Sequence, residues 1–115
     1  YRFGPTGVFR LTEDHSWVAE RLKEGVLTRT EAERHPYRNV LTRALGLPEA
    51  RFDLVEVRLA PGEGVLLVTD GLYGHVPEEE WRLGRDLQAS LEAMVAEALR
   101  RGGDDNVTAV ALRVE

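Results

Sequence analysis

The sequence of 115 residues contains no cysteine, a single lysine and no long hydrophobic run. Without cysteine, the chain can form neither a disulfide nor a thiolate metal site. A membrane-spanning helix needs about 18 consecutive apolar residues, and no segment approaches that length. No signal peptide is visible either, so we expect a cytoplasmic protein without a membrane partner.

Negative charge exceeds positive charge, because 20 Asp and Glu residues stand against 15 Lys and Arg residues, which gives a net charge of −5, and the one lysine is Lys23. Binding to nucleic acid requires clustered positive charge that neutralises phosphates, and no such stripe is present. A composition of 43% hydrophobic and 30% charged residues is typical of a globular chain, one small domain or part of a larger one. The chain begins at Tyr1 rather than Met, so we expect a processed or excised piece of a longer protein.

Hydrophobic periodicity predicts an α+β fold. Gly25 is expected to end a first helix, and Gly102-Gly103 a long one whose apolar stripe runs from Leu87 to Leu99. Thr30 is expected to cap a short helical stretch in a capping box with Glu33. The predicted helical segments are 17–24, 31–34, 77–80 and 87–101, and the predicted strands are 7–12, 39–45, 52–59, 64–69 and 107–114. The unbroken apolar run of 64–69 favours a central strand covered on both faces.

Two acidic residues stand at the ends of apolar strands. Asp70 follows the strand 64–69 and precedes Gly71, whereas Asp105 precedes the strand 107–114. If these strands are antiparallel neighbours, the two carboxylates meet at one edge of the sheet. Because like charges held together repel, a cation or a proton is then required between them. A site made only of oxygen ligands suits Mg²⁺ or Mn²⁺.

Other interpretations of the polar residues remain open. An Asp before Gly is common in turns, and 104–106 can equally be a polar loop. His15 can act as a base, a metal ligand or a neighbour of a helix cap formed by Asp14 or Ser16. A serine nucleophile, Ser16 or Ser90, lacks the G-x-S-x-G motif that would support it. A structural Ca²⁺ or Mg²⁺ domain lacks the ladder of ligands seen in EF-hands.

Three segments in order resemble the metal-dependent serine/threonine protein phosphatases of the PPM (type 2C) family, especially the bacterial members. The first runs from Leu11-Thr12-Glu13-Asp14-His15-Ser16 to Leu41-Thr42-Arg43-Ala44-Leu45-Gly46, similar to the family's "T-x-D-H-S" and "T-R-A-L-G". The second, Leu66-Leu67-Val68-Thr69-Asp70-Gly71-Leu72, is similar to "L-L-x-S/T-D-G-L". The third, Gly103-Asp104-Asp105-Asn106-Val107-Thr108, is similar to "D-N-x-T".

This resemblance implies part of an antiparallel β-sandwich flanked by helices, with a binuclear Mn²⁺ or Mg²⁺ centre that activates water. It implies that Asp70 and Asp105 are metal ligands, that Gly71 and Asn106 are their neighbours, and that phosphoserine or phosphothreonine in a phosphoprotein is the substrate. It assigns no catalytic side chain to this chain. Family members often carry an Asp for a third metal where this sequence has Gly74.

The family domain is about twice as long, and its "D-G-x-G-G" metal motif is absent here. Residues 1–115 therefore resemble the C-terminal half alone, including the flap segment at about 16–40. We expect this fragment to be inactive by itself and to expose apolar strands. Such surfaces recruit either the missing half or a second copy in a homodimer. The alternative is a phosphatase-like interaction domain that lacks catalysis.

Overall fold

The structure is a computed structural model that describes residues 1–115. It contains two compact units, one formed by Tyr1–Leu11 with Val57–Glu115 and the other by Thr12–Glu56. None of the helices is both long enough and apolar enough to cross a bilayer.

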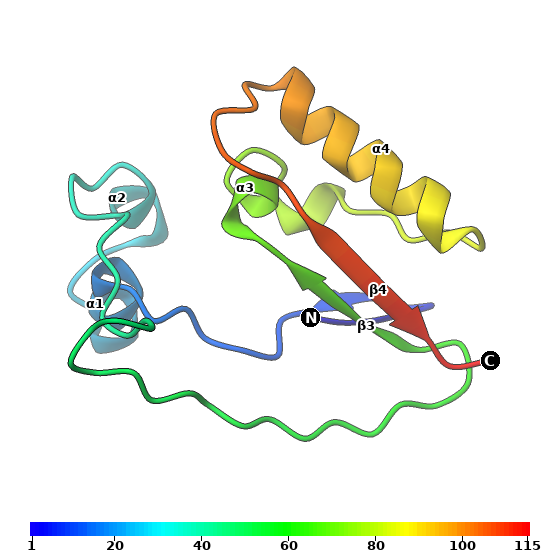
Figure 1. Cartoon of the computed structure of the whole chain (residues 1–115), viewed down its shortest axis with the longest axis horizontal. Helices are drawn as coiled ribbons and strands as arrows, with labels where there is room; N and C mark the ends of the chain where they lie inside the picture. Colours follow the sequence, from blue (N-terminus) through cyan, green and yellow to red (C-terminus); the bar gives the residue numbers. More distant parts are fainter. The chain divides into compact units, whose positions relative to one another are not determined.

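The first unit is built on one antiparallel sheet of four strands in the order β2-β1-β3-β4. The strands are β1 (Arg2–Gly4), β2 (Gly7–Phe9), β3 (Gly64–Val68) and β4 (Ala109–Arg113). In β3 and β4, which lie side by side in Figure 1, Gly64 pairs with Arg113 and Val68 with Ala109. The end of β3 therefore lies beside the start of β4, as the sequence analysis assumed.

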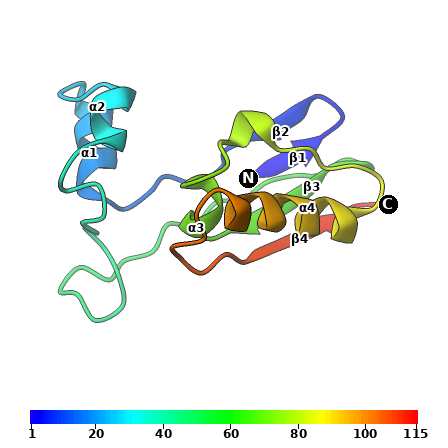
Figure 2. The ribbon, with the colours of Figure 1, turned by 90° about the horizontal axis from the view of Figure 1, so that it is seen from above.

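One face of this sheet is covered by α4 (Leu87–Arg100), which Figure 2 shows running along it. Asp86 begins the helix, because its side chain accepts a hydrogen bond from Ala89 N at 3.1 Å. Two shorter elements, α3 (Asp70–Tyr73) and the 3₁₀ turn η1 (Glu78–Glu80), connect β3 to it. The core between sheet and helix consists of Phe3, Leu66, Leu72, Val76, Trp81, Met94 and Ala98.

The opposite face of the sheet is apolar and exposed. Leu67 pairs with Val110 across β3 and β4, and these side chains are 64% and 57% exposed. Leu112 on the same face is 67% exposed. The prediction that β3 is covered on both faces is therefore wrong for this chain, because its residues supply only one covering layer.

The second unit contains α1 (Trp17–Glu24) and α2 (Arg29–Glu33). Ser16 caps α1 by accepting a hydrogen bond from Ala19 N at 3.2 Å, and Gly25 ends it at φ 78°. The chain returns to the start of α1, where Thr42 N donates to the carbonyl oxygen of His15 at 2.9 Å. The expected helix 17–24 and its glycine stop are thus confirmed.

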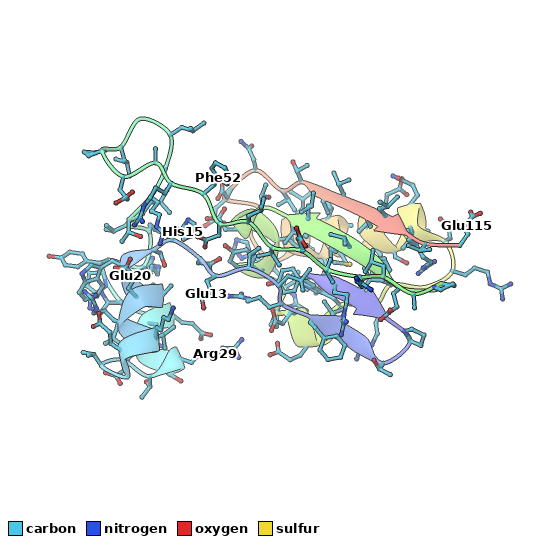
Figure 3. The ribbon with its side chains drawn as sticks, turned by 90° about the horizontal axis from the view of Figure 1, so that it is seen from below. Glu13, His15, Glu20, Arg29, Phe52 and Glu115 are labelled. Carbon is cyan, nitrogen blue, oxygen red and sulfur yellow. The ribbon has the colours of Figure 1, made fainter.

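Several predicted boundaries need correction. The capping box of α2 uses Thr28 and Glu31, two residues before the expected Thr30 and Glu33. Segment 39–45 forms no strand beyond a single bridge from Leu41 to Ser16, and 52–59 forms none. Phe52 in the latter is 82% exposed (Figure 3). Both segments have apolar composition but no neighbouring strand to pair with, and β-propensity is expressed only where such a neighbour exists.

Candidate metal centre

Asp70 stands at the junction between β3 and α3. Thr69 precedes it with φ −87° and ψ 161°, so the chain is still extended there and becomes helical at Asp70 itself. The Asp70 side chain is exposed and makes no hydrogen bond or ion pair within residues 1–115. The apolar run of β3 therefore ends in a carboxylate that lies outside the core and keeps both oxygens available.

Asp105 lies in the loop that joins α4 to β4. Its Oδ1 atom accepts a hydrogen bond from Asn106 N at 2.7 Å, which fixes the carboxylate against its own backbone. The residue is exposed, and its second oxygen has no protein partner. Like Asp70, Asp105 therefore offers a free anionic oxygen at the surface.

Thr69 holds the two loops together beyond the ends of the strands. Its backbone N donates to the carbonyl oxygen of Thr108 at 3.0 Å, and Thr108 N donates to Thr69 Oγ1 at 3.0 Å. The same hydroxyl donates to the carbonyl oxygen of Asn106 at 3.3 Å. The residue before Asp70 is thus bonded to the residue after Asp105, which brings the two acidic segments to one edge of the sheet.

Gly71 makes this close approach possible. A Cβ atom at this position would lie 2.1 Å from the carbonyl oxygen of Asn106, well inside the contact distance of any side chain. Only glycine lets the two backbones meet here. The two residues predicted as neighbours of the metal ligands, Gly71 and Asn106, are therefore in direct contact.

The donor set suits part of a site for a hard cation. Two carboxylates on adjoining segments provide the oxygen ligands that Mg²⁺ and Mn²⁺ prefer. No group of three or more His, Cys, Asp or Glu residues that could hold a metal ion occurs within residues 1–115. Within residues 1–115, Asp70 and Asp105 are therefore two carboxylates that could contribute to such a site.

The other residues considered from the sequence have structural roles. Ser16 is the cap of α1, and Ser90 Oγ both donates to Asp86 O and accepts from Gly84 N at 2.9 Å. Neither serine is hydrogen-bonded to a histidine, so the structure gives no support for a serine nucleophile.

His15 is bonded to a carboxylate of its own unit. His15 Nε2 lies 2.7 Å from Asp53 Oδ2, and Arg43 Nη1 donates to Asp53 Oδ1 at 3.0 Å. These hydrogen bonds, that from His15 first, lower the pKa of Asp53 below its ordinary value. The three residues tie the start and end of the Thr12–Glu56 unit together.

A hydrogen bond between a histidine and an aspartate lies beside the candidate centre. His75, which was not among the candidate residues from the sequence, has its Nε2 atom hydrogen-bonded to Asp104 Oδ1. This hydrogen bond lowers the pKa of Asp104. The signal available in the sequence was proximity alone, since His75 follows Asp70 by five residues and Asp104 directly precedes Asp105.

Comparison with known proteins places the chain in a family. Residues 23–115 match the model described as "Stage II sporulation protein E (SpoIIE)". A relative in Listeria monocytogenes, "Serine/threonine phosphatase stp", is 36% identical over 104 residues, which cover 86% of this chain and 41% of the relative.

Solved structures agree with this assignment. The PPM Ser-Thr phosphatase MsPP from Mycobacterium smegmatis superposes with a TM-score of 0.83 at 34% identity, over 100% of this chain and 51% of that one. The catalytic domain of the phosphatase PstP, solved with two manganese ions, gives 0.82 at 30% identity, over 100% and 49%.

The fold is thus that of the PPM phosphatases. The chain belongs to the SpoIIE family, and its resemblance to the PPM phosphatases is confirmed. It spans 41% of the Listeria relative and about half of each of the two solved structures.

Proposed function

We propose that this chain is the C-terminal half of a PPM-type protein phosphatase domain, with its flap segment at about 16–40. In the intact domain, Asp70 and Asp105 are ligands of a binuclear Mn²⁺ or Mg²⁺ centre. The reaction is hydrolysis of phosphoserine or phosphothreonine in a phosphoprotein. The order of the three sequence motifs and the matched length of about half support the assignment to one half of the domain.

One observation carries this proposal, the contact between Gly71 and Asn106. It brings the residue after each carboxylate within backbone contact of the other segment, in a position that no larger residue than glycine allows. The two acidic segments are thereby held at one edge of the sheet, and two carboxylates brought close together there would repel each other unless a cation lay between them. A relative of similar fold was solved with two manganese ions, which is the kind of cation that these ligands suit.

The residues of this chain have distinct parts in such a site. When bound, the metal centre would supply an activated water for attack on the phosphoester. Asp70 and Asp105 hold negative charge at the sheet edge, and Thr69 and Gly71 keep the two segments in register. Gly74, which ends α3, offers no carboxylate where the third metal of the family is bound, so two metals are proposed.

Because residues 1–115 offer two carboxylates and no third ligand, we expect this chain alone to be inactive. The remaining ligands are proposed to come from the preceding half of the domain. Reading the coding sequence upstream of Tyr1 tests this directly. A "D-G-x-G-G" motif within about the length of this chain supports the proposal, and an unrelated domain there contradicts it.

A second candidate function is a phosphatase-like interaction domain without catalysis. The exposed apolar face of the sheet, with Leu67, Val110 and Leu112, favours it, because exposed apolar patches often bind partners. In the 115-residue chain the simplest partner is a second copy in a two-fold dimer. Light scattering distinguishes a dimer from a monomer, and Leu67→Lys should restore the monomer if this face forms the interface.

The decisive experiment on function is a phosphatase assay of the protein that joins this chain to its N-terminal half. We expect Mn²⁺-dependent release of phosphate from a phosphothreonine peptide, abolished by EDTA. Asp105→Ala should lower the rate by orders of magnitude, because one metal loses an anionic ligand. The matched control is Asp86→Asn, which removes the same charge from the unit but still caps α4, since Asn caps as well as Asp.

Full activity in Asp105→Ala, or in excess EDTA, would contradict the mechanism. No activity in the wild-type protein would favour the interaction domain. The cytoplasmic location expected from the sequence stays a prediction, which cell fractionation tests.

A further inference from the structure

The loop that carries Asp105 is fastened on both sides of that residue. On the Asn106 side, Thr69 and Gly71 contact the backbone as described above. On the other side, Asp104 is bonded to His75 Nε2. Both fastenings lead to the single segment 69–75, which also carries Asp70. We call residues 102–106 the Asp105 loop.

His75 is itself held in place by the core and by α4. Its backbone N donates to the carbonyl oxygen of Leu72, a fully buried residue, at 3.2 Å. Its own carbonyl oxygen accepts a hydrogen bond from Arg101 Nη1 at 3.1 Å. The imidazole packs against the start of the Asp105 loop, since a Cβ on Gly102 would lie 3.1 Å from His75 Cε1. The ring is therefore a fixed point against which the loop can be held.

Arg101 fixes the point where the Asp105 loop leaves α4. Its guanidinium makes a two-bond contact with Glu80, at 2.9 and 2.6 Å, and Nε donates to Glu97 at 2.7 Å. Two-bond contacts of this kind constrain the orientation of the guanidinium as well as its position. The Asp105 loop thus starts directly after Arg101, whose position is fixed, and only the residues after Arg101 can move relative to α4.

The part of the loop after Arg101 begins with two glycines. Gly102 and Gly103 have φ values of 153° and 58°, in the region that glycine enters easily and other residues avoid. Asp104 is the first residue after them. A contact at Asp104 therefore restrains the chain between the two glycines and Asp105. The contacts of Asn106 restrain the chain only on the other side of Asp105.

We propose that His75 and Asp104 form a clasp that holds the Asp105 loop in register with Asp70, so that the two carboxylates can share one metal centre. His75 and Asp104 are positioning residues in this account, and neither binds the metal. The inference rests on the proposed function, because it assigns to these residues a part in the same site. Residues that orient metal ligands from behind typically change metal affinity by about 10-fold to 100-fold when they are replaced.

The test is Mn²⁺ titration by calorimetry of the protein that joins this chain to its N-terminal half. We expect His75→Ala and Asp104→Ala each to weaken Mn²⁺ binding by about 10-fold or more. The double variant should be no weaker than either single variant, because both break the same contact. His75→Gln, which keeps a donor able to reach Asp104, should restore part of the loss.

The His75→Ala variant separates a clasp from simple electrostatics. Removing a basic ring beside a cation site leaves metal binding unchanged or makes it tighter if charge alone matters. Weaker binding in His75→Ala is therefore expected only if the ring positions the loop. The matched control is His35→Ala, the same change in the Thr12–Glu56 unit, for which we expect unchanged affinity. Thermal unfolding identifies any variant that has simply lost its fold.

A second readout needs no metal. Amide hydrogen exchange of residues 104–107 should be faster in His75→Ala than in the wild type, and unchanged in His35→Ala. Wild-type Mn²⁺ binding that Asp70→Asn abolishes and His75→Ala leaves unchanged would overturn the clasp and leave the proposed function intact. No Mn²⁺ binding in the wild type would overturn the proposed function. Amide hydrogen exchange then tests the clasp by itself: equal exchange rates in the wild type and His75→Ala overturn it, and faster exchange in His75→Ala shows that the contact holds the loop.

Discussion

Replacing Gly71 by alanine is the smallest change that should disturb the contact between the two acidic segments. The added Cβ would lie 2.1 Å from the carbonyl oxygen of Asn106 and 2.9 Å from its carbonyl carbon. Because both are backbone atoms, no side-chain rotation relieves the clash. The two backbones must move apart by about 1 Å before the contact reaches the 3.0 Å below which Cβ atoms are essentially never found.

This movement has a cost that the neighbouring contacts set. Overpacking by one methyl group in a close-packed position costs about 1–3 kcal/mol. The hydrogen bonds between Thr69 and Thr108, at 3.0 Å, lie next to the clash and each contributes about 0.5–1.5 kcal/mol. If the two backbones move apart, the clash is relieved but the hydrogen bonds between Thr69 and Thr108 are weakened. We therefore expect Gly71→Ala to lower the free energy of unfolding by about 1–3 kcal/mol.

The assay is equilibrium unfolding in urea, combined with Mn²⁺ titration of the protein that includes the N-terminal half. Gly84→Ala is the matched control, because a Cβ there would meet only Ser90 Oγ at 3.6 Å, an ordinary contact. We expect the control to change stability by less than about 0.5 kcal/mol. If Gly71→Ala were as stable as the control and bound Mn²⁺ as tightly as the wild type, the argument from the Gly71–Asn106 contact would be refuted.

The remaining predictions concern the core, the exposed sheet face and the ion pairs of α4. Leu66→Ala should lower the free energy of unfolding by about 2–5 kcal/mol, because Leu66 is fully buried. Leu67→Ala in the monomeric 115-residue chain should lower it by less than about 1 kcal/mol, because Leu67 is exposed. Chemical denaturation measures both changes, and equal losses would contradict a core on one face of the sheet. Hydrogen bonds from Arg100 and then Arg101 lower the pKa of Glu97 from 4.5 to about 2, so its stabilising effect is fully present above pH 4.5 and is lost as the pH falls toward 2. Thermal unfolding across this range should depend less on pH in Arg101→Gln, and an unchanged profile would contradict the assignment.

The elements that the sequence predicted well are those determined by local signals. Helix α1 was bounded correctly because Ser16 and Gly25 form its cap and its stop. The stripe from Leu87 to Leu99 likewise identified α4, and the apolar run before Asp70 identified β3. In each case the residues that fix where the element begins and ends lie within or next to it in the sequence. Periodicity and capping signals were therefore sufficient to predict it.

The elements that failed depend on distant residues. Strand β1, Arg2–Gly4, is too short to show alternation and exists because Arg2 pairs with Val65 and with Phe9. Segment 52–59 has a strand-like composition but no partner within this chain. The neighbouring positions of Asp70 and Asp105 could be inferred from one assumption, that β3 and β4 are antiparallel. The bond between His75 and Asp104 could not, since it depends on the path of a loop that contains two glycines.

We propose that Asp70 and Asp105 jointly hold the metal in the intact domain. This proposal is tested most directly by Mn²⁺ titration of the protein that joins this chain to its N-terminal half, comparing Asp70→Asn and Asp105→Asn with the capping control Asp86→Asn. If the two carboxylates share the metal, each of the first two variants loses most of the Mn²⁺ affinity while the control binds as the wild type does. Tight Mn²⁺ binding that survives in both Asp70→Asn and Asp105→Asn would contradict it.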